Sequence, residues 1–362
     1  MNRWTRYAAK LRLKPPRKPC RLRFASAASL CPALRGGHLL WPAEKTCLNR
    51  YAVGHRRCLA LAGVMLTTAV VAVAAQSRDT CNRECMIDVT EAYLSAMVAR
   101  DPAKAPVTAN VRFTQNTRPM ALGQGVWESI KGVRSYKLFV TDPAAGQVAL
   151  YTVVDGAERP GLLTLRLKVE GRRINEIESV YVGIGQTGFG SVDNLVIVDP
   201  VWTAVLPPAE RRPRAEMVDI ANRYFETLEK NIVDHVPFTT NCLRIENGVQ
   251  TAGRAGAPGL AGLGCRENVN HPMWNYITQI APRRHLVVDE ERGLVSGMYM
   301  FRHGGTEPTY TLPNGEVIKH SEAMLRRQAV VISELFKIED GKIRRIEAVM
   351  AGGLDHDAPS GW

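Results

Sequence analysis

The chain has 362 residues and a formal net charge of +12. Residues 1–58 contain 14 Lys and Arg against one acidic residue, whereas the remainder contains 33 basic and 34 acidic residues. The excess charge therefore belongs to the N-terminal segment, and the rest of the chain lacks the basic stripe that nucleic-acid binding requires.

An apolar run follows Arg56 and Arg57 and ends in Ala72-Val73-Ala74. A basic segment, an apolar segment and an A-x-A site are the three parts of a secretory signal peptide. The run is shorter than the ~20 residues of a membrane-spanning helix. We expect a signal peptide at 58–75, cleaved near Ala74 or Ala75, and a secreted or periplasmic protein. An uncleaved anchor is the alternative.

The first 57 residues are basic, Pro-rich and aperiodic, so they do not resemble a packed domain. They are either a disordered extension or the product of a start site placed too far upstream. The sequence does not decide between the two.

Four cysteines follow the predicted cleavage site, and an even number in an exported chain favours two disulfides. We expect Cys242 to pair with Cys265, because they bracket a Gly-rich segment at 249–264, and Cys81 to pair with Cys85. The alternative is that one of these two cysteine pairs stays unbonded. The cysteines support a metal site less well, because no second close pair of Cys or His residues completes a tetrahedral set of ligands.

The chain after the signal peptide is an internal repeat. Residues 92–116 align without a gap on 223–247, and Tyr93 then matches Tyr224. Residues 174–180 align on 343–349 near the end of each copy. One mismatch places Phe113 opposite Arg244, which suggests that this strand is slipped or bulged in one copy.

Each copy predicts a long helix, a strand, a short helix that carries a Trp, and three or four antiparallel strands. Helical periodicity opens both copies, and β patterns follow at 146–154, 163–169, 293–301 and 330–338. Helices segregated from an antiparallel sheet define an α+β class. We place the two domains at 80–190 and 213–352, with a linker at 191–212 and a tail at 353–362.

This order of elements resembles the cone-shaped fold of the nuclear transport factor two-like, or SnoaL-like, superfamily, here in tandem. In that fold a curved antiparallel sheet packs on the long N-terminal helix. The chain is also similar to exported fungal and bacterial proteins of unknown function in five segments: Cys81–Cys85, Ala121–Trp127, Val288–Gly293, Glu334–Ile343 and Ser360–Trp362. The resemblance implies an apolar pocket with a few polar groups at its base, in a superfamily of cofactor-free enzymes and binding proteins.

The second copy holds the candidate catalytic groups. Tyr299 and His303 alternate with Phe301 on one strand face and could act as acid and base. Glu334 interrupts an apolar strand, so it is either at an edge or buried with a perturbed pKa. We predict that His271 is an N-cap near a pocket mouth. The alternatives are an aromatic core stripe and a plain helix start.

We expect ligand contacts from aromatic side chains of both copies: Tyr224, Trp274, Phe301, Trp127 and Tyr93. The first copy has Leu165 where the second has Glu334, so we expect any activity in the second copy, with His303 and Glu334 as an acid/base pair. His235 and His320 are predicted at the surface.

Two functions remain open: binding of a small apolar or aromatic molecule, and cofactor-independent acid/base catalysis by a lyase, isomerase or hydratase. A structural or interaction module is a third reading. No nucleotide, metal or nucleophile motif has its required context, so we expect no cofactor and no metal. The expected partner is a small molecule, with neither nucleic acid nor, after cleavage, a membrane. We expect an intrachain pseudo-dimer of the two copies, with homo-oligomers as a further alternative.

Overall fold

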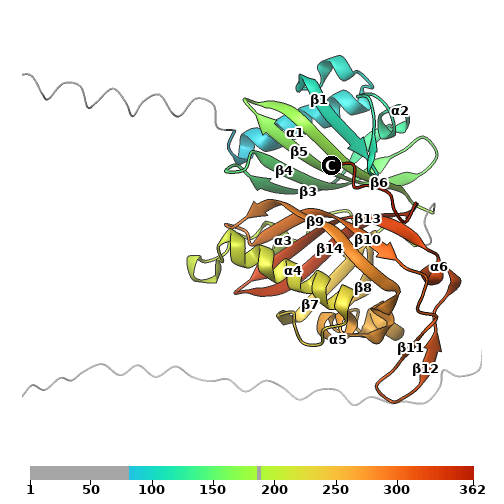
Figure 1. Ribbon diagram of the computed structural model, residues 1–362. Helices are drawn as coiled ribbons and strands as arrows, with labels where there is room; N and C mark the ends of the chain where they lie inside the picture. Colours follow the sequence, from blue (N-terminus) through green and yellow to red (C-terminus); the bar gives the residue numbers. More distant parts are fainter. Residues whose placement is uncertain (1–80, 186–188) are drawn as a thin grey trace, which may run out of the picture. The chain divides into compact units, whose positions relative to one another are not determined.

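A computed structural model describes residues 81–185 and 189–362 (Figure 1). The predicted N-terminal extension and signal peptide lie outside the described residues. The described part contains two α+β domains, each with a long helix followed by a six-stranded mixed sheet. None of its helices is long and apolar enough to cross a membrane.

The first domain orders its strands β2-β1-β6-β5-β4-β3. Its helical segments are α1 (Arg83–Val98), η1 (Pro102–Lys104) and α2 (Val126–Ser129). Its strands are β1 (Val107–Gln115), β2 (Arg118–Pro119), β3 (Gly132–Asp142), β4 (Gln147–Asp155), β5 (Pro160–Glu170) and β6 (Arg173–Gly183).

The second domain repeats this order as β8-β7-β14-β13-β10-β9. After α3 (Pro200–Thr203) and η2 (Pro208–Glu210), its helical segments are α4 (Arg214–Lys230), η3 (Gly259–Gly262), α5 (Cys265–Val269), η4 (Pro272–Tyr276) and α6 (Glu322–Leu325). Its main strands are β7 (Phe238–Glu246), β8 (Val249–Ala252), β9 (Ile277–Asp289), β10 (Leu294–His303), β13 (Gln328–Glu339) and β14 (Lys342–Leu354). A separate hairpin, β11 (Thr309–Thr311) and β12 (Val317–Lys319), follows β10.

Each sheet contains one parallel pair that the predicted antiparallel sheets did not include. Strand β1 runs parallel to β6, and β7 runs parallel to β14. A parallel pair needs a long crossover. Here the β3-β4-β5 meander and its counterpart in the second domain supply that crossover, so the first strand returns beside the last.

The predicted slip between Phe113 and Arg244 is wrong. Phe113 pairs with Ile177 and Arg244 pairs with Ile346, which are equivalent residues of the two copies. Both strands also shift register at corresponding places. Arg244 therefore takes the inward position of a core phenylalanine.

Each long helix buries an apolar face against its own sheet. In α1 this face includes Tyr93 and Met97, and in α4 it includes Tyr224 and Phe225. The Asn82 side chain caps α1 by accepting a hydrogen bond from the Cys85 amide at 2.9 Å.

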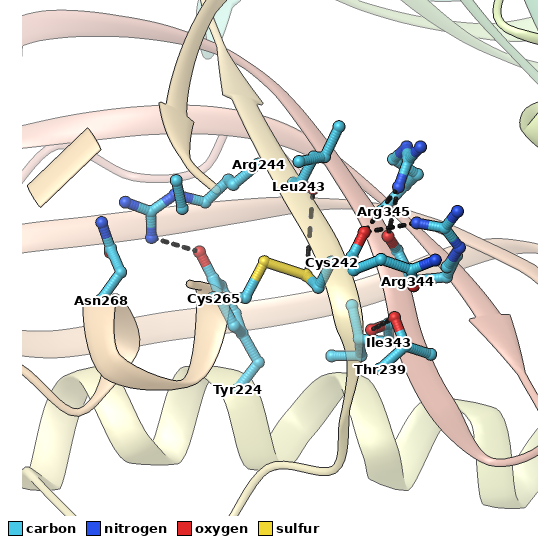
Figure 2. Close-up of a disulfide and its surroundings, with 12 residues drawn as sticks. Tyr224, Thr239, Cys242, Leu243, Arg244, Cys265, Asn268, Ile343, Arg344 and Arg345 are labelled. Carbon is cyan, nitrogen blue, oxygen red and sulfur yellow. Dashed lines mark hydrogen bonds between the residues drawn. A yellow bond between two sulfur atoms is a disulfide. The ribbon is translucent and has the colours of Figure 1, made fainter. Parts of the chain in front are cut away.

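Both predicted disulfides are confirmed. Cys81 bonds to Cys85 at the start of α1, and Cys242 of β7 bonds to Cys265 of α5 (Figure 2). The second bond closes the loop that contains β8 and η3.

The two sheets share an apolar cluster. Buried side chains from both domains contribute to it: Leu138, Val140, Val153, Leu162 and Val180 from the first; Leu294, Met298, Met300, Val331 and Leu335 from the second. Within it, the buried Tyr151 hydroxyl shares hydrogen bonds with Ser296 (2.9 Å) and Ser333 (3.1 Å). The Tyr136 hydroxyl donates to Glu347 at 2.6 Å.

Beyond β14 the tail contacts both domains. Arg302 of β10 donates to the backbone carbonyls of His356 and Ala358. The Trp362 indole donates to the Thr114 hydroxyl of β1 at 2.8 Å. The Arg112 guanidinium lies 4.0 Å from the centre of the Trp362 ring, so a cation–π contact holds this end of the tail.

We predict that residues 76–190 and 213–362, produced separately, aggregate or form dimers. Each half would expose the apolar sheet face that the other now covers, and large exposed apolar patches drive association. Size-exclusion chromatography with light scattering measures the outcome. Mixing the halves should restore a one-to-one complex, whereas two well-behaved monomeric halves would contradict the proposed pseudo-dimer.

Candidate functional site

The second domain contains a cavity of about 490 Å³. It lies between the concave face of the sheet and the elements α4, η4 and α6. Its lining combines polar and apolar groups: Phe189, Tyr224, Leu228, Arg244, Glu246, Asn247, Trp274, Tyr276, Ile277, Phe301, His303, Ser321, Ala323, Met324, Arg326, Gln328, Val330, Ile332, Glu334, Met350, Gly352 and Gly353.

Glu334 forms part of the cavity floor. It lies on β13, between β10 and β14, so it is a central and not an edge position. Its residue is 2% exposed, and its Oε2 has no hydrogen-bond partner among the described residues. Burial raises the pKa of Glu334 to about 8, and Glu246 adds to the rise, while Arg244 and the Tyr224 hydroxyl partly offset it. The carboxyl is therefore mainly protonated at neutral pH.

Arg244 lies on the same floor and is also 2% exposed. Its Nε is 3.3 Å from Glu246, and its Nη1 donates to the Tyr224 hydroxyl at 3.4 Å (Figure 2). The guanidinium carbon lies 5.2 Å from the centre of the Trp274 ring. Arg244 is two residues from Cys242 and on the same face of β7, so the disulfide to α5 anchors the strand segment that carries it.

The first domain has no such charged floor. Phe113, Gln115 and Leu165 occupy the positions of Arg244, Glu246 and Glu334. Phe113 and Leu165 are buried in the apolar core, and the Gln115 side chain accepts a hydrogen bond from the Val126 amide at 2.9 Å.

The predicted first-domain ligand contacts, Trp127 and Tyr93, are packed inside that core. Trp127 is 1% exposed, and its indole donates to the Tyr93 hydroxyl at 3.0 Å. In the second domain Trp274 is only half-buried and donates instead to the Asn268 carbonyl at 2.7 Å, which leaves its ring on the cavity wall.

His303 lines the opposite end of the cavity from Glu334. In the β10–β13 ladder His303 pairs with Gln328, whereas Glu334 pairs with Gly297. His303 and Glu334 are therefore six residue positions apart along the strand direction, a distance of roughly 20 Å at the usual rise per residue. The two predicted groups share one cavity but do not form an acid/base pair. Burial lowers the pKa of His303 to about 4, and His356 adds to the decrease, so the imidazole is neutral near pH 7.

Tyr299 and His271 lie outside the cavity lining. Tyr299 is fully buried, and its hydroxyl is 2.8 Å from His285 Nδ1. His271 caps η4, as predicted, by accepting a hydrogen bond from the Met273 amide at 3.3 Å. Tyr224, Trp274 and Phe301 all line the cavity.

The predicted surface position of His320 is wrong, because it is 7% exposed and its Nε2 is 2.6 Å from the Asn275 side-chain oxygen. His235 is half-buried, with Nε2 3.0 Å from Glu226.

Sequence reasoning missed Arg244 and Glu246. For Arg244 the signal was present in the repeat, where it replaces the core residue Phe113 just as Glu334 replaces Leu165. Glu246 replaces the polar Gln115 and gave no such signal. Two apolar-to-charged replacements at inward positions indicate a polar floor. Among the described residues, no three His, Cys, Asp or Glu side chains lie close enough together to hold a metal ion.

Comparison with known proteins gives a family match over the second domain. The family described as a domain of unknown function (DUF8021) matches residues 210–350. No curated protein matches the chain.

Several solved structures match one domain's length of this chain. One is the epoxide hydrolase/cyclase-like enzyme SalBIII, which acts in pyran ring formation in the polyether salinomycin. The two are 18% identical, with 39% of this chain and 96% of that one covered and a TM-score of 0.24. Another, from Jannaschia sp. CCS1, is described as a SnoaL-like polyketide cyclase. It is 12% identical, with 40% and 88% covered and a TM-score of 0.25.

A third is PrhC from Penicillium brasilianum, which is 17% identical, with 28% and 82% covered and a TM-score of 0.23. Each sheet of this chain is preceded by a long helix, and the two sheets have the same strand order, so the described part is a tandem of two similar α+β domains.

Proposed function

We propose that the second domain binds a small, largely apolar molecule that carries an acceptor oxygen, and that the protein does so after export. Aromatic and aliphatic side chains supply most of the cavity wall, which favours an apolar ligand. Both disulfides support an oxidising compartment.

The unpartnered Oε2 of Glu334 carries this proposal. A buried polar atom without a hydrogen bond costs about 1–3 kcal/mol. Because the carboxyl is mainly protonated, it can donate a hydrogen bond, and its Oε2 has no partner among the described residues although Glu334 lines the cavity. A ligand oxygen bound there would satisfy it.

The aromatic fluorescent dye anilinonaphthalene sulfonate, which carries one anionic sulfonate group, tests the cavity directly. We predict that the wild-type chain binds it in one saturable site and that Ile332→Trp lowers the affinity at least about tenfold, equivalent to about 1.4 kcal/mol. The larger ring would occupy the space between Phe301 and Glu334. The matched control is Ile197→Trp, at a position 81% exposed and outside the cavity lining.

Equal dye binding by the wild type and Ile332→Trp would contradict the proposed site. Circular dichroism of both variants checks that the fold is retained, so that loss of binding reports on the cavity.

Proton transfer by Glu334 is a second candidate function, and the raised pKa of its carboxyl favours it. A group with a pKa near the working pH can donate a proton to a bound molecule and recover it later. His303 is too distant to be its direct partner, so Tyr224 and Arg244 would be the supporting groups. Mass spectrometry of a bound molecule before and after incubation distinguishes turnover from binding.

A further inference from the structure

The cavity follows one strand for most of its length. Gln328, Val330, Ile332 and Glu334 are alternate residues of β13, so they share one face, and all four line the cavity. From the first to the last the strand advances roughly 20 Å at ~3.3 Å per residue. A cavity that follows the strand over this length fits an elongated ligand.

The two ends of this row are polar and the middle is apolar. The Glu334 end is closed, because Tyr224, Arg244 and Glu334 are each at most 2% exposed. At the Gln328 end the lining residues Ser321, Arg326 and Gly352 are exposed, so this end is the mouth. Between the two ends lie Phe301, Val330 and Ile332.

The mouth presents hydrogen-bond donors. The Gln328 amide nitrogen donates to His303 Nδ1 at 3.4 Å, while the Gln328 carbonyl accepts from the Gly353 amide at 3.1 Å. Since Nδ1 accepts a hydrogen bond, the neutral imidazole carries its proton on Nε2, which remains a donor. The Arg326 guanidinium adds a positive charge, and no ion pair of the described residues includes it.

Building on the binding role proposed for this cavity, we infer that its ligand is an elongated aliphatic acid with a second oxygen at the far end of its chain. The carboxylate lies at the mouth beside Arg326 and His303. The hydrocarbon chain contacts Phe301, Val330 and Ile332. The second oxygen, a hydroxyl or carbonyl, accepts the hydrogen bond of Glu334.

Displacement of the bound dye by four aliphatic probes tests this assignment in the chain that begins at Gln76. The probes are palmitic acid, its methyl ester, ω-hydroxypalmitic acid and the methyl ester of that acid. We expect ω-hydroxypalmitic acid to bind about tenfold more tightly than palmitic acid, because it gains one buried hydrogen bond. Each acid should bind more tightly than its ester.

Two variants separate the two ends. Glu334→Leu should abolish the preference for the ω-hydroxyl and leave the preference for acid over ester. Arg326→Gln should do the reverse. Arg327→Gln is the matched control, because Arg327 is exposed, pairs with Asp357 and does not line the cavity.

Equal affinity for palmitic and ω-hydroxypalmitic acid would contradict the inference that the ligand has a second oxygen at Glu334. An unchanged acid preference in Arg326→Gln would overturn the carboxylate position. If no aliphatic probe displaces a dye that Ile332→Trp excludes, the ligand class is wrong although the binding site stands. If the dye binds Ile332→Trp as tightly as the wild type, the proposed binding site itself is wrong.

Discussion

Replacing Arg244 with methionine should lower the free energy of unfolding by about 3–5 kcal/mol, because removal of one partner leaves a buried charge uncompensated. Glu246 would lose the guanidinium 3.3 Å away, and Tyr224 would lose a donor. Partial exposure of Glu246, 15% for its side chain, favours the lower end of this range. Urea unfolding at a fixed pH measures the change.

Arg223→Met is the matched control for this variant. Arg223 lies on α4 and pairs with Asp219 one helical turn away, with both side chains about half exposed. Exposed pairs of this spacing contribute only about 0.3–0.5 kcal/mol. Equal small losses in the two variants would contradict an electrostatic role for Arg244 at the cavity floor.

Replacing Glu334 with leucine should increase the free energy of unfolding, and the gain should be larger at pH 8 than at pH 6.5. The pKa of this carboxyl is about 8 in the folded chain, above its ordinary value of 4.5. Its contribution to stability is thus full below about pH 4.5 and is lost as the pH rises toward 8. At pH 8 we expect a gain of about 1–3 kcal/mol, because leucine needs no hydrogen-bond partner.

The pH window matters for this measurement. Burial lowers the pKa values of His285 and His303 to about 4, so both histidines reduce stability as the pH falls below about 6.5. Glu347, with a pKa raised by burial to about 7, acts in the same direction as Glu334 and leaves a residual slope in the variant. The comparison is therefore cleanest between pH 6.5 and pH 8.

Glu334→Gln is the control, because it keeps the size of the side chain and removes its ionisation. It should flatten the pH dependence without the full gain of leucine. A lower stability of Glu334→Leu at pH 8 than of the wild type would show that the carboxyl stabilises the fold. The first domain supports the expected direction, since Leu165 occupies the equivalent position and is buried in its core.

The repeat made most of the fold predictable from the sequence. The alignment of 92–116 on 223–247, with Tyr93 opposite Tyr224, and of 174–180 on 343–349 established the order of helices and strands in both copies. Spacing of Cys242 and Cys265 around a Gly-rich segment was sufficient for the disulfide. The parallel strand pair was not predictable in this way, because periodicity reports which face a residue occupies and not which strand lies beside it.

The candidate site was predictable only in part. Glu334 stood out as a charge in an apolar strand, and the structure places it on the cavity floor. Its predicted partner His303 is at the other end, because distance across a sheet depends on the register between strands. Arg244 was hidden by the assumption of a slipped strand, although its position opposite Phe113 was the relevant signal.

The tail that joins Trp362 to Thr114 has a consequence for the order of folding. These two residues are 248 positions apart in the chain. During synthesis the β1 edge therefore emerges long before the segment that covers it, and the second domain has to be made first. Contacts of such large sequence separation form slowly. We therefore expect docking of the tail to be a late step in forming the surface around Thr114.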